Sequence, residues 1–289
     1  MDFPPFEHLL YYEKVHGARL NISFSNIREF HLDGFRRKLP KDLDLNWTFR
    51  NGTPELRRLI AKRHRTSPKR VLVTTGATEA NFLVNASLVH PRERVLVDVP
   101  IYSPLRDVPR GVGAKVVEIP RNCDSAAEFG PRMIALSTVT KVCGLGTLRV
   151  GWIVGAPDLL DRFAGLKDYT TGGGSILSQT IATWALGQWD FFLRRAKRIL
   201  DANRRIVAEA INEMPALQGD VPRGGIVLFP HCTVDVAKLA NRLLKQYGTV
   251  IAEGRFFGAP DHFRLGLGGE TRNLREGLAN LRQLLGSMS

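Results

Sequence analysis

Short apolar segments that alternate with helical patterns constrain the fold of this chain most strongly. Val71–Thr75 has the composition of a buried strand, and the turn at Gly76–Ala80 leads directly into an apolar helical pattern. Further strand patterns follow at Val95–Pro100 and Lys115–Pro120, separated by a helix-like piece from Leu105 to Gly113. Strands that alternate with helices predict an α/β fold with a largely parallel sheet covered on both faces.

The second half of the chain predicts a smaller α+β domain. A helical pattern from about Ser178 to Met214, bent near Gly187, has the length of a helix that bridges two domains. After it come a helical pattern at Val236–Tyr247, a terminal helix, and strand patterns at Gly224–Phe229, Thr249–Ala252 and His262–Leu267. We expect a large domain at 40–195 and a small domain made of 196–289 and 1–39, which includes an amino-terminal arm.

Composition limits the class of protein. The chain has 289 residues, of which 44% are hydrophobic, and these suffice for a sizeable core. Neither a membrane-spanning run nor a signal-peptide pattern is present, so we expect a cytoplasmic protein without a membrane partner. Three widely spaced cysteines favour packing roles over a disulfide framework or a zinc site. The net charge of +13 fits anionic substrates or a solvated surface better than nucleic acid, since no nucleic-acid-binding motif accompanies it.

One lysine stands at the end of an apolar strand pattern. The stretch Met133–Lys141 is an apolar run that passes into hydroxyl residues and ends in the lysine, and glycines then lead to Arg149. This order predicts a strand that delivers Lys141 into a site, which makes Lys141 the candidate reactive group.

Two further features point to a ligand at the carboxyl ends of the strands. The turn Gly76-Ala77-Thr78 lies between a strand and a helix, so its free N–H groups and the helix dipole suit a phosphate. Many such turns bind nothing, and that interpretation stays open. Tyr102 follows the next strand, where open α/β sheets place their ligands; a tyrosine that only packs in a turn is the alternative.

In this order, the motifs resemble fold-type I pyridoxal-phosphate (PLP) enzymes, in particular class I/II aminotransferases. The resemblance covers nearly the whole chain. Six ordered segments support it: Gly52-Thr53-Pro54-Glu55-Leu56-Arg57, Thr75-Gly76-Ala77-Thr78-Glu79-Ala80, Pro100-Ile101-Tyr102, Ser137-Thr138-Val139-Thr140-Lys141, Leu148-Arg149-Val150-Gly151-Trp152 and Phe263-Arg264-Leu265.

The resemblance implies a role for each part of the cofactor site. Lys141 would form the internal aldimine with PLP and later move a proton, which a desolvated amine with a lowered pKa can do. Arg149, eight positions later, would grip the phosphate with its planar fork. The Thr138 hydroxyl and the backbone of Gly76, Ala77 and Thr78 would bind the same group.

The resemblance also implies a substrate site. Tyr102 would stack on the cofactor ring, and Arg264 would bind the α-carboxylate of the substrate bidentately. Asn26, in the amino-terminal arm, would line the pocket. The expected partners are an amino acid, a 2-oxo acid and a second copy of the chain in a homodimer with shared sites.

This sequence departs from the family in two places. Trp47 stands five residues before Gly52, where the family usually has a tyrosine that reaches the phosphate of the neighbouring subunit. Only fourteen positions separate Ile119 from Met133, where the family has two more strands, an Asn-Pro-x-Gly turn and an Asp-x-x-Tyr pair. The asparagine and tyrosine that bond the ring hydroxyl, and the aspartate that keeps the ring nitrogen protonated, therefore have no counterpart.

The short connection allows two interpretations. Pro120 to Arg132 is just long enough for one parallel crossover, which would bring the flanking strand edges together or leave them unpaired. Alternatively, the native polypeptide contains the missing segment. We favour the second interpretation because every other element is retained. A large spatial jump between Arg121 and Arg132 would support it, and a continuous, well-packed chain would refute it.

The leading hypothesis is a PLP-dependent aminotransferase. Another PLP reaction on the same scaffold, β-elimination or decarboxylation, is a related alternative. A degenerate, non-catalytic binding protein is the alternative from a different class, and the missing aspartate favours it.

Overall fold

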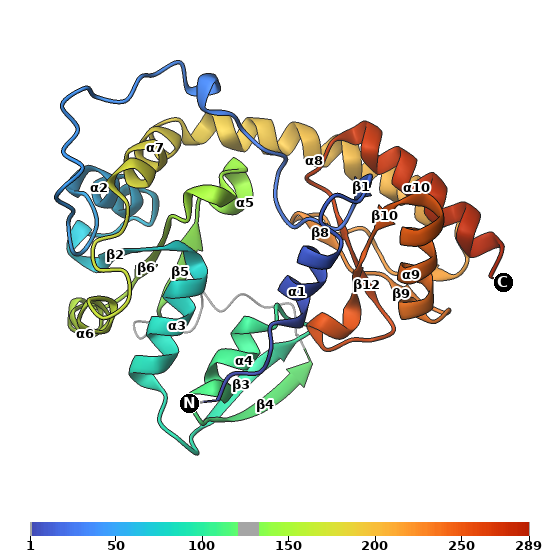
Figure 1. The fold of residues 1–289 in the computed structure, drawn as a ribbon, viewed down its shortest axis with the longest axis horizontal. Coiled ribbons are helices and arrows are strands. Elements are labelled where there is room, and N and C mark those ends of the chain that lie inside the picture. Colours follow the sequence, from blue (N-terminus) through green and yellow to red (C-terminus); the bar gives the residue numbers. More distant parts are fainter. Residues whose placement is uncertain (1, 121–132, 289) are drawn as a thin grey trace.

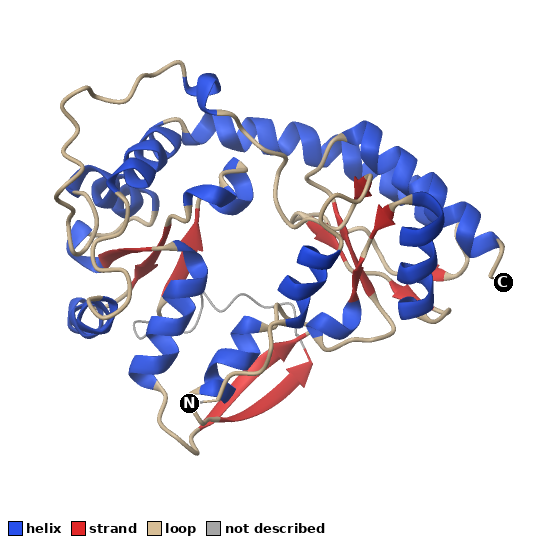
Figure 2. Ribbon diagram, in the orientation of Figure 1, coloured by secondary structure: helices blue, strands red, loops and turns tan. Residues whose placement is uncertain are grey.

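The computed structural model describes residues 2–120 and 133–288. Two lobes lie at opposite ends of the long helix α8 (Trp189–Asn212), which runs along the top of Figure 1. Helices and strands are distributed over both lobes, as Figure 2 shows. Among the described residues, no helix is both long and apolar enough to cross a membrane.

A three-stranded sheet forms the centre of the large lobe. Its order is β2 (Val71–Thr74), β6 (Gly151–Val154), β5 (Ala135–Thr138), and β6 runs antiparallel to both neighbours. The outer strands therefore run parallel to each other. This confirms the α/β fold class and adds a reversed strand that the sequence pattern did not predict.

Both faces of this sheet are buried under helices. On one face Leu72 and Ile153 pack against α3 (Gly76–Leu88) and α6 (Pro157–Lys167). The alternating residues, which include Val73 and Trp152, form a second core with α2 (Pro54–Arg63) and α7 (Ile176–Gly187) on the opposite face. Side chains that alternate between two apolar cores explain why these strands are nearly continuous hydrophobic runs.

A separate two-stranded sheet lies next to the first. Strands β3 (Arg94–Val99) and β4 (Lys115–Pro120) are parallel and are joined by α4 (Pro104–Gly111). Within the described ranges, β3 pairs only with β4 and β5 pairs only with β6. The two flanking edges are therefore not brought together, and Leu96 of β3 is 63% exposed. The test of a jump between Arg121 and Arg132 falls outside the described residues.

The small lobe has its own core. Its helices are α8, α9 (Val236–Tyr247) and α10 (Thr271–Gly286), and buried leucines from all three pack with Phe263, Leu265 and the arm residue Ile22. Its short strands are β1 (Leu20–Asn21), β7 (Leu217–Gln218), β8 (Val227–Leu228), β9 (His231–Cys232), β10 (Thr249–Val250), β11 (Ala252–Glu253) and β12 (Phe263–Gly266). The domain boundaries near 40 and 195 stay predictions.

Several expected elements differ in detail. The long helical pattern is two helices, because α7 ends at Gly187 and α8 begins two residues later. The arm contains a helix, α1 (Glu7–Lys14), that the sequence pattern did not indicate.

Candidate active site

Lys141 lies on a single helical turn, α5 (Thr140–Cys143), that follows β5 directly. Its Nζ donates a hydrogen bond to Ser25 Oγ at 2.9 Å, and its carbonyl accepts one from the N–H of Ile27 at 3.0 Å. The turn ends at Gly144 with φ +71°, and a Cβ there would lie 2.4 Å from the carbonyl oxygen of Arg28. The amino-terminal arm thus holds the lysine turn at three points.

The surroundings of Lys141 lower its basicity. Its pKa falls from 10.5 to about 8, chiefly because protein atoms displace water around the amine, and then because of the charges of Arg264 and Arg149. The residue nevertheless keeps an exposed surface, so the amine remains accessible from solvent. Both charged groups that act on it are cations, which favours the neutral, nucleophilic form.

The turn after β2 is built for close backbone approach. Gly76 begins α3 with φ +80°, and a Cβ on it would lie 2.3 Å from Arg149 Nη2. A Cβ on Gly151 would likewise lie 2.5 Å from the carbonyl carbon of Gly76. The Thr75 side chain makes no capping bond, and no side chain of the described residues bonds the N–H groups of Ala77 and Thr78, so these two can bind an anion.

The two other predicted phosphate ligands are placed differently. Arg149 is exposed, with φ +51°, and its Nη1 donates to the carbonyl of Gly146 at 3.3 Å. The rest of its guanidinium remains available beside Gly76. Thr138 Oγ1 donates to the carbonyl of Val150 at 2.7 Å. The Thr138 hydroxyl would have to rotate before it could donate to a phosphate.

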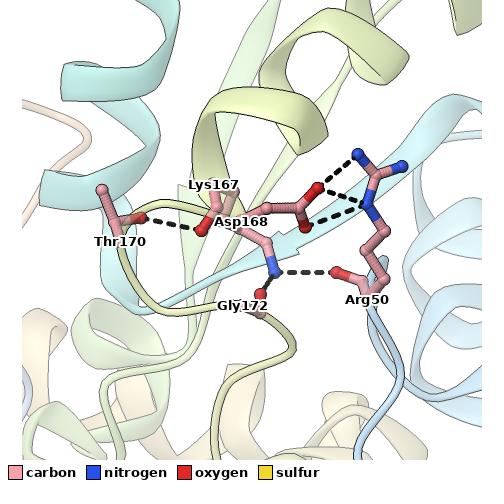
Figure 3. Close-up of polar contacts among 5 residues, drawn as sticks. All are labelled: Arg50, Lys167, Asp168, Thr170 and Gly172. Atoms are coloured by element: carbon pink, nitrogen blue, oxygen red, sulfur yellow. Dashed lines mark hydrogen bonds and ion pairs between the residues drawn. The ribbon is translucent and has the colours of Figure 1, made fainter.

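A polar cluster supports the loops beside this turn (Figure 3). The Nζ of Lys167, a fully buried side chain, donates to the carbonyls of Arg50, at 2.7 Å, and Gly172. Arg50 also forms an ion pair with Asp168 at 2.6 Å. The loops at 47–53 and 167–174 are thereby joined. Next to them is a cavity of about 250 Å³ whose walls include Thr75, Arg149, Lys167 and Gln179.

Glu79 connects the same loop to the phosphate turn. One carboxylate oxygen accepts the N–H of Thr75 at 2.5 Å, and the other accepts the hydroxyls of Thr170 and Thr171 at 2.9 and 2.6 Å. Sequence reasoning did not single out Glu79, because its partners Thr170 and Thr171 are 91 and 92 residues away.

The predicted substrate arginine is buried in an aromatic environment. Arg264 is only 7% exposed, and its guanidinium carbon lies 4.9 Å from the centre of the Phe257 ring. Its charge acts on both Lys141 and Tyr102, which places the three groups in one electrostatic neighbourhood. Tyr102 is 40% exposed, and its ring meets Phe6 edge-on at 5.6 Å.

The structure also places Asn26, predicted to line the pocket, and Trp47, where the sequence departs from the family. Asn26 lines a second cavity, of about 340 Å³, between the arm and the start of α10, whereas its neighbour Ser25 bonds Lys141. Trp47 is 68% exposed. Ser25 and the helix α1 were missed by sequence reasoning, because an irregular arm gives no periodic signal.

The residues present fit one end of PLP. The close approach at Gly76, the Arg149 guanidinium and the N–H groups of the first turn of α3 suit its phosphate. Lys141 suits its aldehyde carbon. Among the described residues, no carboxylate contributes to the lowered pKa of Lys141.

The fold is that of the fold-type I class of PLP-dependent proteins. The model of the family "Aminotransferase class I and II" matches residues 45–133 and 122–281, that is, most of the chain. The chain belongs to this family, whose cofactor is pyridoxal 5'-phosphate. The two matched stretches overlap at 122–133.

Individual relatives agree with the family. Capreomycidine synthase from Streptomyces vinaceus is 36% identical over 161 residues, which are 54% of this chain and 41% of the relative. The chain thus aligns with less than half the length of that curated relative. A PLP-dependent aminotransferase from Streptococcus suis superposes with a TM-score of 0.91 at 22% identity, covering 100% of this chain and 99% of that one. The PLP-dependent cyclase OrfR gives 0.90 at 22% identity, with the same coverage.

Proposed function

We propose that this chain is an aminotransferase that moves an amino group between an amino acid and a 2-oxo acid. The observation that carries the proposal is the placement of Lys141, an amine with a pKa of about 8, under the influence of Arg264 and Arg149. One arginine suits a carboxylate and the other a phosphate. When bound, PLP supplies the electron sink that labilises a bond at the substrate Cα.

The protein side of the reaction is divided among these residues. Arg264 binds the substrate carboxylate and so fixes the Cα next to Lys141, while the first turn of α3 and Arg149 hold the phosphate. The neutral Lys141 amine would act as the base that removes the Cα proton, and its ammonium form would deliver that proton to the cofactor carbon that receives it in transamination. Tyr102, at the edge of the same group, shields the ring face from water.

A second candidate is cyclisation of an amino acid on the same scaffold. The 36% identity to capreomycidine synthase over 161 residues favours it, since a probable aspartate/prephenate aminotransferase is only 22% identical over 169 residues. Both candidates use the same lysine and the same carboxylate site. They differ only in the steps after removal of the Cα proton.

The missing acidic partner of the ring nitrogen favours a third candidate, a binding protein without turnover. β-Elimination and decarboxylation, the other PLP reactions on the same scaffold, remain alternatives to transamination. A homodimer and a cytoplasmic location stay predictions. For the dimer, the exposed Trp47 is the residue that would extend toward a neighbouring subunit.

The test combines mapping of the PLP-labelled residue with analysis of the reaction products. Purified protein is loaded with PLP, reduced with borohydride and digested, and the pyridoxyl label is mapped by mass spectrometry. We expect the label on Lys141, and no label in Lys141→Ala. Amino donors are then screened with pyruvate and 2-oxoglutarate, with analysis for new amino acids, cyclic products and ammonia. A labelled Lys141 without any product would leave the binding protein as the function, and an unlabelled chain would refute every PLP reaction.

A further inference from the structure

The Arg264 guanidinium is held by acceptors from the arm and α1. Nε donates to the carbonyl of Ser23 at 2.8 Å. Nη2 donates to Tyr12 Oη at 2.9 Å and faces His8 Nε2 at 3.4 Å. These three bonds use the Nε hydrogen and both hydrogens of Nη2, whereas Nη1 has no hydrogen-bond partner in the described part of the chain.

The hydrogen of each hydroxyl in this network is assigned by its neighbours. Ser23 Oγ donates to Asn21 Oδ1 at 2.8 Å, and it lies 2.6 Å from Tyr12 Oη. Because the Ser23 hydrogen is used, Tyr12 must donate to Ser23 and can only accept from Arg264. The relay therefore runs in one direction, from Arg264 through Tyr12 and Ser23 to Asn21.

His8 is an acceptor of a different kind. Since Arg264 can only donate, the His8 Nε2 that faces it must be unprotonated. Burial, followed by the charges of Arg264 and Lys141, lowers the pKa of His8 to about 3, which keeps the ring neutral. Its contact with Arg264 is 0.5 Å longer than that of Tyr12, so it is the weaker of the two bonds to Nη2.

We propose that Tyr12 is a positioning residue for Arg264, and that His8 is an exchangeable acceptor whose place on Nη2 the substrate carboxylate takes. The carboxylate then binds Nη1 and one hydrogen of Nη2, the two ends of the guanidinium fork, while Tyr12 and the Ser23 carbonyl keep the fork in place. This inference rests on the assignment of Arg264 to the substrate carboxylate in the proposed function.

Carboxylate binding tests the two roles separately. The probe is succinate, which has no amino group and cannot react, and its Kd is measured by calorimetry on chains with and without PLP. We expect Tyr12→Phe to raise Kd about tenfold to a hundredfold, because a bond to a charged group that orients the fork is lost. His8→Phe keeps an aromatic ring and removes only the exchangeable acceptor, so its Kd should stay within about threefold of the parent.

Tyr11→Phe is the matched control. Tyr11 lies on the same helix, and its hydroxyl donates to the carbonyl of Ile251 at 2.9 Å without touching Arg264. If Tyr12→Phe acted only by loosening α1, Tyr11→Phe would weaken succinate binding equally, and that result would overturn the proposal. A Tyr12→Phe Kd within twofold of the parent, a His8→Phe loss as large as that of Tyr12→Phe, or no succinate binding by the parent would also overturn it. Failure of PLP to label Lys141 would refute the proposed function alone. It would leave the succinate measurement on cofactor-free chains unaffected, so the two failures can be distinguished.

Discussion

Lys141 Nζ and Ser25 Oγ are joined by a 2.9 Å hydrogen bond across a sequence separation of 116 residues. The bond fastens the amino-terminal arm to the turn that presents the amine. The segment of the arm that follows the two-residue strand β1 is irregular, and it nevertheless helps to position the candidate reactive amine.

Replacing Ser25 with alanine should make Lys141 less basic. The hydroxyl accepts a hydrogen bond from the ammonium form, so its loss favours the neutral amine, and the pKa should fall below about 8. The measurement is the pH midpoint of PLP attachment, followed by absorbance. Ser287→Ala, at the far end of α10, serves as control and should leave the midpoint unchanged. An upward shift in Ser25→Ala would contradict the assigned bond.

The pH dependence of PLP attachment should follow Lys141. With a pKa of about 8 the neutral amine rises from about a tenth of molecules at pH 7 to a half at pH 8. The attachment rate should therefore increase with pH and level off above about pH 9. Arg264→Gln removes a charge that lowers this pKa, so its midpoint should move upward. A midpoint that is the same in both proteins would contradict the electrostatic account.

The same shift links stability to pH. Because the folded pKa lies below the ordinary value of 10.5, the unfolded chain holds the extra proton between about pH 8 and 10.5. Stability contributed by this group should rise with pH across that window. Urea titrations of the parent and of Lys141→Met over this range measure the difference, and the variant should lack the rise.

Gly76→Ala should damage both stability and phosphate binding. Alanine at φ +80° costs about 1–2 kcal/mol, and its Cβ would lie 2.3 Å from Arg149 Nη2, which must then move. Urea unfolding gives the first effect. The effect on phosphate binding is measured as the affinity for PLP divided by the affinity for pyridoxal, which lacks the phosphate, and this ratio should fall. Gly187→Ala is the control, since nothing lies within 4 Å of a Cβ there.

Lys167→Met should loosen the loop drawn in Figure 3. The change leaves the carbonyls of Arg50 and Gly172 without their donor in a buried place, at a cost of about 1–3 kcal/mol. Hydrogen exchange of the amides at 170–174 should become faster. Lys197→Met removes an exposed i,i+4 ion pair instead and should change stability by less than about 0.5 kcal/mol. Equal effects of the two variants would contradict the structural role of Lys167.

Many strands and helices of both lobes could be predicted from local patterns. Strands buried on both faces read as apolar runs, and Leu72 and Val73 do point to different cores. The helix α9 begins and ends where its periodicity predicts. By contrast, the reversed direction of β6 leaves no mark on composition, because a strand buried on both faces has the same pattern in either direction.

The site was predictable only in part. Lys141, Arg149 and the Gly76 turn stand at strand ends, where position along the chain already implies position in space. The roles of Ser25, Tyr12 and His8 depend on contacts between segments more than a hundred residues apart, such as that of His8 with Arg264. No local pattern encodes such contacts.

By itself, the sequence determined the α/β class and predicted the candidate lysine and the arginines that accompany it, since these follow from local hydrophobic patterns and from motif residues next to them. Only the tertiary structure decided how the amine and Arg264 are held. Their hydrogen-bond partners come from an arm and a short helix whose placement depends on packing against distant residues. The tertiary structure also decided how the strands pair, and in the described residues β3 and β5 lie in separate sheets. Strand pairing is a long-range interaction, so the sequence could only state that the edges of these strands would either be brought together or stay unpaired.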